Sequence, residues 1–299
     1  MGNVGVGFDI LGLAFQGLGD RVVVERRNEP GAVILAVEGS DDIPLDPAGN
    51  TASVAANAFL KMIEAQQGVE IIIKKGLPLA SGLGSSAASA VAAVVATNAL
   101  FGSPLSRTAL LPACLEGEAL VSGYHLDNVA PCLMGGITLV STNTIDRVRH
   151  LPVPEGLFFA LVTPDVRVLT ANARAVLPRV ISLETMIAQT AAVAYLVDAL
   201  HRGDVDAVAA AMGKDGIVEP ARVHMMPQFY RIREVAKKAG ALAVVISGAG
   251  PTLCAVCSAN HVAHAVATVM HNVYDQSGIG CMTHVTQVDE QGARVLSVH

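Results

Sequence analysis

The pattern of apolar and polar positions predicts short strands and longer helices along the whole chain. In the first half, runs of β-branched residues are typical of strands, and apolar segments without Gly or Pro are typical of helices. The expected strands are 21–26, 33–37, 69–74 and 136–140, and the expected helices are 50–67, 87–100 and 108–120. Strand and helix do not alternate regularly, so this half is predicted to be α+β.

A polar segment with prolines, 143–154, suggests a boundary between a domain at 1–150 and one at 151–299. In the second half the expected strands are 158–163, 241–246, 253–258 and 281–288, and the expected helices are 183–201, 205–211, 228–238 and 260–274. The final order of strand, turn, strand, helix and strand suits a ferredoxin-like layer of helices on an antiparallel sheet.

The composition of the chain excludes several classes of protein. The chain has 299 residues, of which 52% are hydrophobic and 15% charged, so a disordered chain is excluded. No apolar run reaches the ~18–20 residues of a membrane span, and a net charge of −6 without a basic run predicts no nucleic-acid partner. Five cysteines without an export signal favour reduced thiols in a cytoplasmic protein with no membrane partner.

A glycine- and serine-rich loop lies between the expected strand 69–74 and the expected helix 87–100. Its glycines allow close backbone approach, and the helix start offers free N–H groups and a positive dipole end, which together suit a phosphate. The alternative is a capped turn of small residues, because a glycine-rich loop alone is a weak signal. The candidate phosphate-binding residues are Pro78, Leu79, Ala80, Ser81, Gly82, Leu83, Gly84, Ser85, Ser86, Ala87 and Ala88.

Two more glycine-rich segments, residues 3–9 and 247–252, stand at opposite ends of the chain. With the loop at 78–88, they resemble the three signature motifs of the GHMP kinases (galacto-, homoserine, mevalonate and phosphomevalonate kinases). The resemblance implies a two-domain α+β fold, with an N-terminal domain like the second domain of ribosomal protein S5 and a ferredoxin-like C-terminal domain. It also implies ATP as co-substrate, with its phosphates wrapped by the middle motif.

The segment Tyr-His-Leu-Asp-Asn-Val-Ala-Pro-Cys at 124–132 is similar to one found in the homoserine kinase branch of that family. This resemblance implies ATP-dependent phosphorylation of L-homoserine, a step toward threonine, with Asn128 and Arg174 in the catalytic machinery. The substrate-binding residues that it implies are Asn3, Asp9, His125, Asn128, Thr170, Arg174, Arg222 and Gly248.

The chemistry of these residue types agrees with such a substrate. An arginine fork binds a carboxylate through two hydrogen bonds, which suits Arg174 and Arg222, and Asp9 suits an ammonium group. A hydroxyl and a carboxylate suit Mg²⁺, and the family's metal positions correspond to Ser86 and Glu118. Because the spacing from Glu118 to His125 is one residue shorter than usual, Glu116 is the alternative ligand.

A general base is not expected. Several GHMP kinases use an aspartate at the position that Asn128 occupies here, and the neighbouring Asp127 should diverge from Asn128 in an extended segment. We therefore expect catalysis by alignment and charge stabilisation, with the hydroxyl proton passing to a phosphate oxygen or to water.

The first residues depart from the family pattern. Family members begin with a strand and an Ala-Pro-x-Ser segment, whereas here Asn3 already belongs to the first motif. We therefore expect an unpaired sheet edge and poor order at Asn3 and Asp9. Two alternatives stay open: another GHMP kinase of the mevalonate type, and a non-catalytic protein that binds ATP or an amino acid. A homodimer is also left open.

Overall fold

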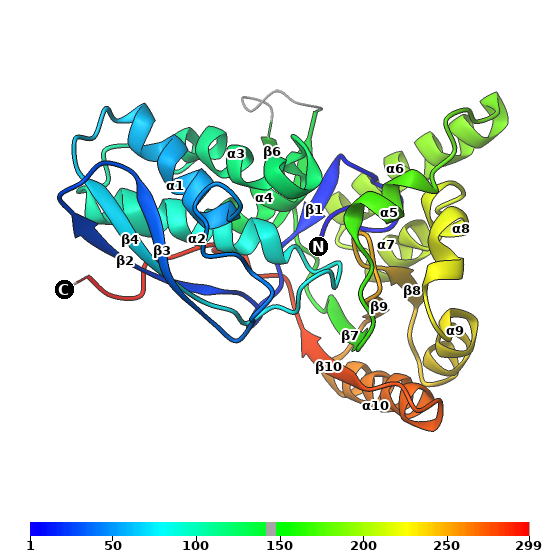
Figure 1. Cartoon of the computed structure of the whole chain (residues 1–299). Coiled ribbons are helices and arrows are strands. Elements are labelled where there is room, and N and C mark those ends of the chain that lie inside the picture. The colour runs from blue at the N-terminus through cyan, green and yellow to red at the C-terminus, as the bar shows by residue number, and fades with distance from the viewer. Residues whose placement is uncertain (142–147, 299) are drawn as a thin grey trace.

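The computed structural model describes residues 1–141 and 148–298. It consists of two regions that lie side by side, with the N-terminal half on the left of Figure 1 and most of the C-terminal half on the right. Both regions mix helices with sheets, as the sequence predicts.

The N-terminal region is built on a three-stranded sheet in the order β2-β4-β3. Strand β4 pairs with β2 antiparallel and with β3 parallel, and its apolar side chains Val69, Ile71 and Ile73 are fully buried. Helices α1, α2 and α3 cover the face of the sheet on which these side chains lie. Helix α3 approaches α1 so closely that a Cβ at Gly117 would lie 2.5 Å from the Thr51 carbonyl oxygen. The elements are β2 (Arg21–Arg27), β3 (Ala32–Glu38), α1 (Thr51–Met62), β4 (Gly68–Lys74), α2 (Ser85–Leu100), a 3-10 turn (Thr108–Leu110) and α3 (Leu111–Ser122).

A second small sheet, in the order β1-β5-β6, lies at the centre of the molecule. It consists of β1 (Leu11–Leu13), β5 (Ile137–Val140) and β6 (Val148–Leu151), and α4 (Leu126–Met134) packs beside it. Strand β6 falls inside the segment 143–154 that was expected to mark a domain boundary, and residues 143–147 of that segment lie outside the described part. Strand β1 and helix α4 were not predicted, because β1 is short and α4 contains Pro131.

The expectation of a poorly ordered start is wrong. Met1 and Asn3 are buried, the amino group of Met1 donates a hydrogen bond to the Leu13 carbonyl oxygen at 2.8 Å, and Gly2 bridges to Gly12. The first residues are therefore held against β1 by backbone hydrogen bonds and by apolar packing.

The C-terminal region is a four-stranded antiparallel sheet in the order β10-β7-β9-β8. Taken in chain order the strands lie 4-1-3-2, so the expected ferredoxin-like arrangement is confirmed. Its strands are β7 (Phe158–Pro164), β8 (Ala243–Ile246), β9 (Leu253–Cys257) and β10 (Cys281–Thr286), and its helices are α5 (Thr170–Ala175), α6 (Leu183–Arg202), α7 (Val205–Met212), α8 (Val218–Arg222), α9 (Phe229–Lys238) and α10 (Asn260–Gln276).

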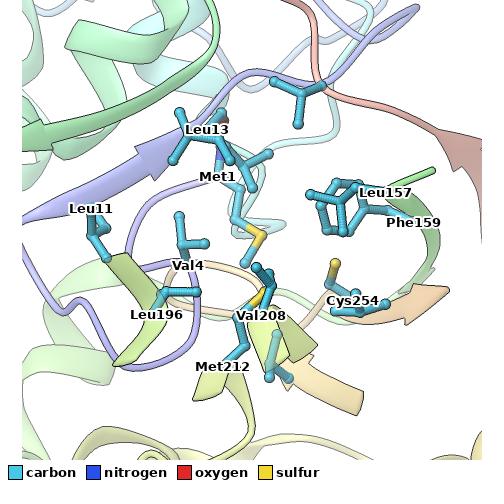
Figure 2. Packing of buried hydrophobic residues seen from close by; sticks show 14 of the residues in the cluster. Met1, Val4, Leu11, Leu13, Leu157, Phe159, Leu196, Val208, Met212 and Cys254 are labelled. Carbon is cyan, nitrogen blue, oxygen red and sulfur yellow. Dashed lines mark hydrogen bonds between the residues drawn. The ribbon is translucent and has the colours of Figure 1, made fainter. Parts of the chain in front are cut away.

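The two faces of this sheet have different partners. One face packs against α9 and α10, whereas the other packs against α6, α7 and the first residues of the chain. Figure 2 shows this second core, where Met1 and Val4 lie among Phe159, Leu196 and Met212. The N-terminal segment is thus fixed by the C-terminal sheet, so the two regions share one core.

The C-terminal tail returns to the N-terminal region, where the red trace in Figure 1 runs back beside α4 and the first sheet. Val288 bridges to Phe15, and the Ala293 amide donates to the Cys132 carbonyl oxygen at 2.9 Å. Residues beyond 288 therefore contact the first half of the chain rather than the ferredoxin-like sheet.

Helix α6 is long and apolar enough, by length and composition, to cross a membrane, which the sequence pattern did not predict. Glu184 lies in its first turn and Arg202 in its last turn. Its buried residues lie toward its C-terminal half. The N-terminal half projects from the body of the molecule at the upper right of Figure 1.

Candidate active site

A cavity of about 300 Å³ lies between the two regions and takes its lining from both. It brings together all of the predicted substrate and metal residues, from segments up to 245 residues apart in the chain. Those residues are Asn3, Asp9, Ser86, Glu118, His125, Asn128, Thr170, Arg174, Arg222 and Gly248.

One wall of the cavity is the predicted phosphate loop. Helix α2 begins at Ser85, earlier than expected, after Gly84 in the left-handed conformation at φ 76°. No side chain caps this helix start, and Gly84, Ser85 and Ser86 line the cavity, so the first N–H groups of the helix are available to an anion there. Gly82 is also left-handed, and a Cβ there would lie 2.2 Å from the Ser247 carbonyl oxygen.

The third glycine-rich segment braces this loop. The Ser247 hydroxyl donates to the Gly82 carbonyl oxygen at 2.9 Å, and the Thr252 amide donates to the Ser81 carbonyl oxygen at 3.2 Å. These bonds fix the loop from the C-terminal region.

Not every predicted loop residue faces the cavity. The lining includes Leu79, Ala80, Ser81, Gly82, Gly84, Ser85 and Ser86. The remaining four, Pro78, Leu83, Ala87 and Ala88, do not line it. Leu83, Ala87 and Ala88 are buried in the core, and the Pro78 carbonyl accepts a hydrogen bond from the Ser81 hydroxyl. The binding role of these four residues stays a prediction.

A buried ion pair that sequence reasoning missed supports the start of α2. Lys75 pairs with Asp20 and also donates to the Ser85 carbonyl oxygen at 3.1 Å and to the Ser89 hydroxyl at 3.0 Å. Burial lowers the pKa of Lys75, and the charge of Asp20 opposes that shift. The sequence does not indicate this pair, because Asp20 directly precedes β2 and Lys75 directly follows β4, 55 residues later.

The two predicted metal ligands are in contact. The Ser86 hydroxyl donates to a Glu118 carboxylate oxygen at 2.7 Å, and Glu118 is only 1% exposed. Burial raises the pKa of Glu118 to about 7. The alternative ligand Glu116 does not line the cavity and accepts a hydrogen bond from the exposed Tyr124 hydroxyl, so the geometry favours Glu118.

These donors fit a hard divalent cation. A hydroxyl and a buried carboxylate with no cationic side chain bonded to it provide oxygen ligands. Residues 1–141 and 148–298 hold no cluster of three or more metal-binding side chains. Nucleotide and water oxygens would therefore complete the coordination.

At the other end of the cavity, Asp9 and Arg174 form a two-pronged ion pair. The Arg174 nitrogens lie 2.6 and 2.9 Å from the Asp9 carboxylate oxygens. His125 Nδ1 lies 3.6 Å from the same carboxylate, and burial lowers the pKa of His125 while Asp9 opposes the shift. Thr170 begins α5 and lies one turn before Arg174, as the four-residue spacing predicts.

Arg222 is a buried guanidinium group without a carboxylate. It is 2% exposed and donates to the carbonyl oxygens of Ala173 and Gly248, each at 2.9 Å. No ion pair in the described part of the chain includes it. Burial and the nearby charge of Arg174 lower its pKa to about 10. A buried cation at a cavity wall without a carboxylate partner is able to pair with an anion that enters the cavity.

Asn128 and Asp127 lie on the first turn of α4, so the expectation that this segment is extended is wrong. Asn128 faces the phosphate loop, where a Cβ at Gly84 would lie 3.1 Å from its side-chain oxygen. Asp127 is buried, and one of its carboxylate oxygens has no hydrogen-bond partner. Burial, with the charge of Asp9, raises the pKa of Asp127 to about 6.

Comparison with protein families matches both halves of the chain. Residues 50–136 match the GHMP kinases N terminal domain, and residues 196–275 match the GHMP kinases C terminal domain. A homoserine kinase of Chlorobaculum tepidum is 38% identical over 312 residues, covering 99% of this chain and 96% of that protein. The chain belongs to the GHMP kinase family. Like its relatives in this family, it is an ATP-dependent small-molecule kinase.

Solved structures of GHMP kinases share the fold. A homoserine kinase from Cytophaga hutchinsonii has a TM-score of 0.92 and 40% identity, covering 97% of this chain and 92% of that one. A mevalonate kinase of L. major in complex with R-mevalonate has a TM-score of 0.69 and 16% identity, covering 92% and 87%. The second likeness shows the fold alone, whereas the first agrees with the homoserine kinase branch.

Proposed function

We propose that this GHMP kinase transfers the γ-phosphoryl group of ATP to the hydroxyl group of L-homoserine, giving O-phospho-L-homoserine on the route to threonine. The observation that carries the substrate assignment is the group of charges opposite the phosphate loop. A buried, carboxylate-free Arg222 and the Asp9–Arg174 pair offer both signs of charge in one cavity.

A zwitterionic amino acid matches this charge pattern. Its carboxylate would bind Arg222 and Arg174, and its ammonium group would bind Asp9, replacing the ion pair that Asp9 and Arg174 now form with each other. Asn3, His125, Thr170 and Gly248 complete the polar wall around the substrate.

The nucleotide end is proposed to work through backbone groups. The N–H groups at the start of α2 and in the glycine loop would bind the phosphates. Ser86 and Glu118 would hold Mg²⁺, which when bound neutralises charge on the transferred phosphoryl group.

Catalysis is proposed to come from alignment and charge stabilisation. Asn128, beside Gly84, would orient the substrate hydroxyl toward the phosphates, and Arg174 would stabilise negative charge. The hydroxyl proton would pass to a phosphate oxygen or to water. Asp127 is the cavity carboxyl group that could serve instead as a base, so its removal is a direct test of this mechanism.

The proposal also covers assembly and location. Exposed apolar side chains gather before and along the first half of α6: Val180, Ile181, Leu183, Met186 and Ile187. We propose that a second copy of the chain covers this apolar surface, because a two-fold axis pairs one surface with the same surface of the partner. A standard interface buries roughly 800 Å² of each partner. Leu183→Asp should convert a dimer to a monomer in sedimentation, whereas Leu296→Asp in the exposed tail should not. A cytoplasmic location stays a prediction.

The activity is tested with a substrate panel. With Mg-ATP, turnover of L-homoserine should far exceed that of mevalonate or galactose. Mevalonate carries a carboxylate but no ammonium group, so it would leave Asp9 without its ligand. Equal or greater turnover of mevalonate would assign the protein to the mevalonate-type alternative, and ATP binding without turnover of any acceptor would support the non-catalytic one.

A further inference from the structure

Gln189, on helix α6, connects two segments that carry substrate-site residues. Its side-chain nitrogen donates to the Val6 carbonyl oxygen at 2.8 Å, and its side-chain oxygen accepts from the Gly216 amide at 3.1 Å. The two segments lie more than 200 residues apart in the chain, and Gln189 itself does not line the cavity.

The first segment is the loop that holds Asn3 and Asp9. Its backbone takes the left-handed conformation at Asn3, Val4, Gly5 and Asp9, which is costly for the three residues that are not glycine. A loop with such backbone angles needs anchors outside itself. Beyond its own hydrogen bonds, it is held by the Asp9 ion pair with Arg174, by the Asn3 bond to Gly248 and by the Gln189 bond to Val6.

The second segment leads into α8, the short helix that ends at Arg222. Asp215 caps this helix by accepting from the amides of Val218 and Glu219, and Gly216 lies between the cap and the helix. By holding the Gly216 amide, Gln189 fixes the start of the helix from which Arg222 reaches the cavity.

We infer that Gln189 is a positioning residue that sets the distance between Asp9 and Arg222, the groups proposed to bind the ammonium and the carboxylate of the amino acid. This inference rests on the proposed function. The phosphate loop has separate anchors in Ser247 and Thr252, so loss of Gln189 should affect the amino acid and spare the nucleotide.

The test compares Gln189→Leu with Gln16→Leu in the full chain. Gln16 is a matched control because its side-chain nitrogen also donates to a distant backbone carbonyl, that of Val288, at 3.1 Å, away from the cavity. Gln189→Leu should raise the KM for homoserine roughly tenfold, with the KM for ATP changed less than twofold. Gln16→Leu should change neither constant.

A second variant, Gln189→Glu, separates the two bonds. It keeps the acceptor for the Gly216 amide but loses the donor to Val6, so its KM for homoserine should also rise while its melting temperature stays near that of the unmodified protein. A homoserine KM unchanged in both variants, or equal increases in the KM for homoserine and for ATP, would overturn the inference. Failure of the unmodified protein to phosphorylate homoserine would instead overturn the proposed function.

Discussion

The proposed phosphate end and the proposed amino-acid end of the cavity are built in different ways. The phosphate end comes mainly from one continuous segment, residues 79–86, and presents backbone N–H groups in a loop that is held by backbone and short side-chain hydrogen bonds. The amino-acid end comes from five separated segments and presents long charged side chains, of which Asp9 and Arg174 pair with each other. Backbone geometry thus defines the first end, and charge balance defines the second.

The largest effect is expected from a change at the proposed Mg²⁺ ligand Glu118. Glu118→Gln keeps the shape of the side chain but removes its charge, so kcat should fall on the order of 10²–10³-fold and the Mg²⁺ requirement should rise. Steady-state kinetics with titrated Mg²⁺ measures both. The exposed Glu116→Gln is the control, and an effect there with none at Glu118 would reverse the metal assignment.

A glycine pair tests whether backbone geometry defines the phosphate end. Gly82→Ala places a Cβ 2.2 Å from the Ser247 carbonyl oxygen and should lower kcat/KM for ATP roughly 10²-fold. Gly102→Ala is the control, because Gly102 has the similar φ of 82° but no atom within 4 Å of the added Cβ. It should cost about 1 kcal/mol of stability and leave the kinetics unchanged. Equal kinetics for both variants would contradict the close-approach account.

Charge geometry at the amino-acid end is tested by Arg222→Lys. Lysine keeps the charge but loses the two-pronged fork, so the KM for homoserine should rise on the order of 10–100-fold while the KM for ATP is unchanged. Arg231→Lys, at an exposed position, is the control. A rise in the KM for ATP instead would move Arg222 to the nucleotide site.

Because Glu118 is a proposed Mg²⁺ ligand and burial raises its pKa to about 7, the Mg²⁺ requirement should depend on pH. Protons compete with the metal below pH 7, so the half-saturating Mg²⁺ concentration should rise about tenfold per pH unit below 7 and level off above it. Without metal, the folded state holds the proton more tightly than the unfolded one, so stability should fall as the pH rises from about 5 to 7. Glu118→Gln should flatten the Mg²⁺ dependence and weaken the stability dependence. Part of the stability dependence should remain between about pH 4 and 6, because burial also raises the pKa of Asp127 to about 6. If both dependences persist unchanged in that variant, another group is responsible.

The smallest effect is expected from Asp127→Asn. If alignment carries the reaction, kcat should fall less than about tenfold, whereas loss of a general base would cost roughly 10²–10⁴-fold. A pH profile of kcat that loses its acid limb in this variant would identify Asp127 as the base.

The sequence predicted most of the helices and strands and most of the residues that line the cavity. Its errors fall where the secondary structure that the local sequence favours differs from the one that tertiary packing stabilises. Helix α4 was missed because Pro131 disfavours a helix interior, yet burial of Val129 and Leu133 stabilises it. The start of the chain was expected to be poorly ordered. The sequence does not show what holds it, because the hydrogen bond to the Leu13 carbonyl oxygen and the packing in the core around Phe159 arise only in the folded protein.

The sequence by itself determined the glycine-rich loop that is proposed to bind phosphate, since glycine spacing and a following helix are local properties that adjacent residues encode. It also determined the types of charge that the amino-acid end needs. Only the tertiary structure decided that Arg222 is buried without a carboxylate, that Asp9 pairs with Arg174, and that Lys75, Asp20 and Gln189 hold the loops that carry these groups. Burial and pairing depend on which distant segments meet, and those contacts form only when the two regions fold onto their shared core.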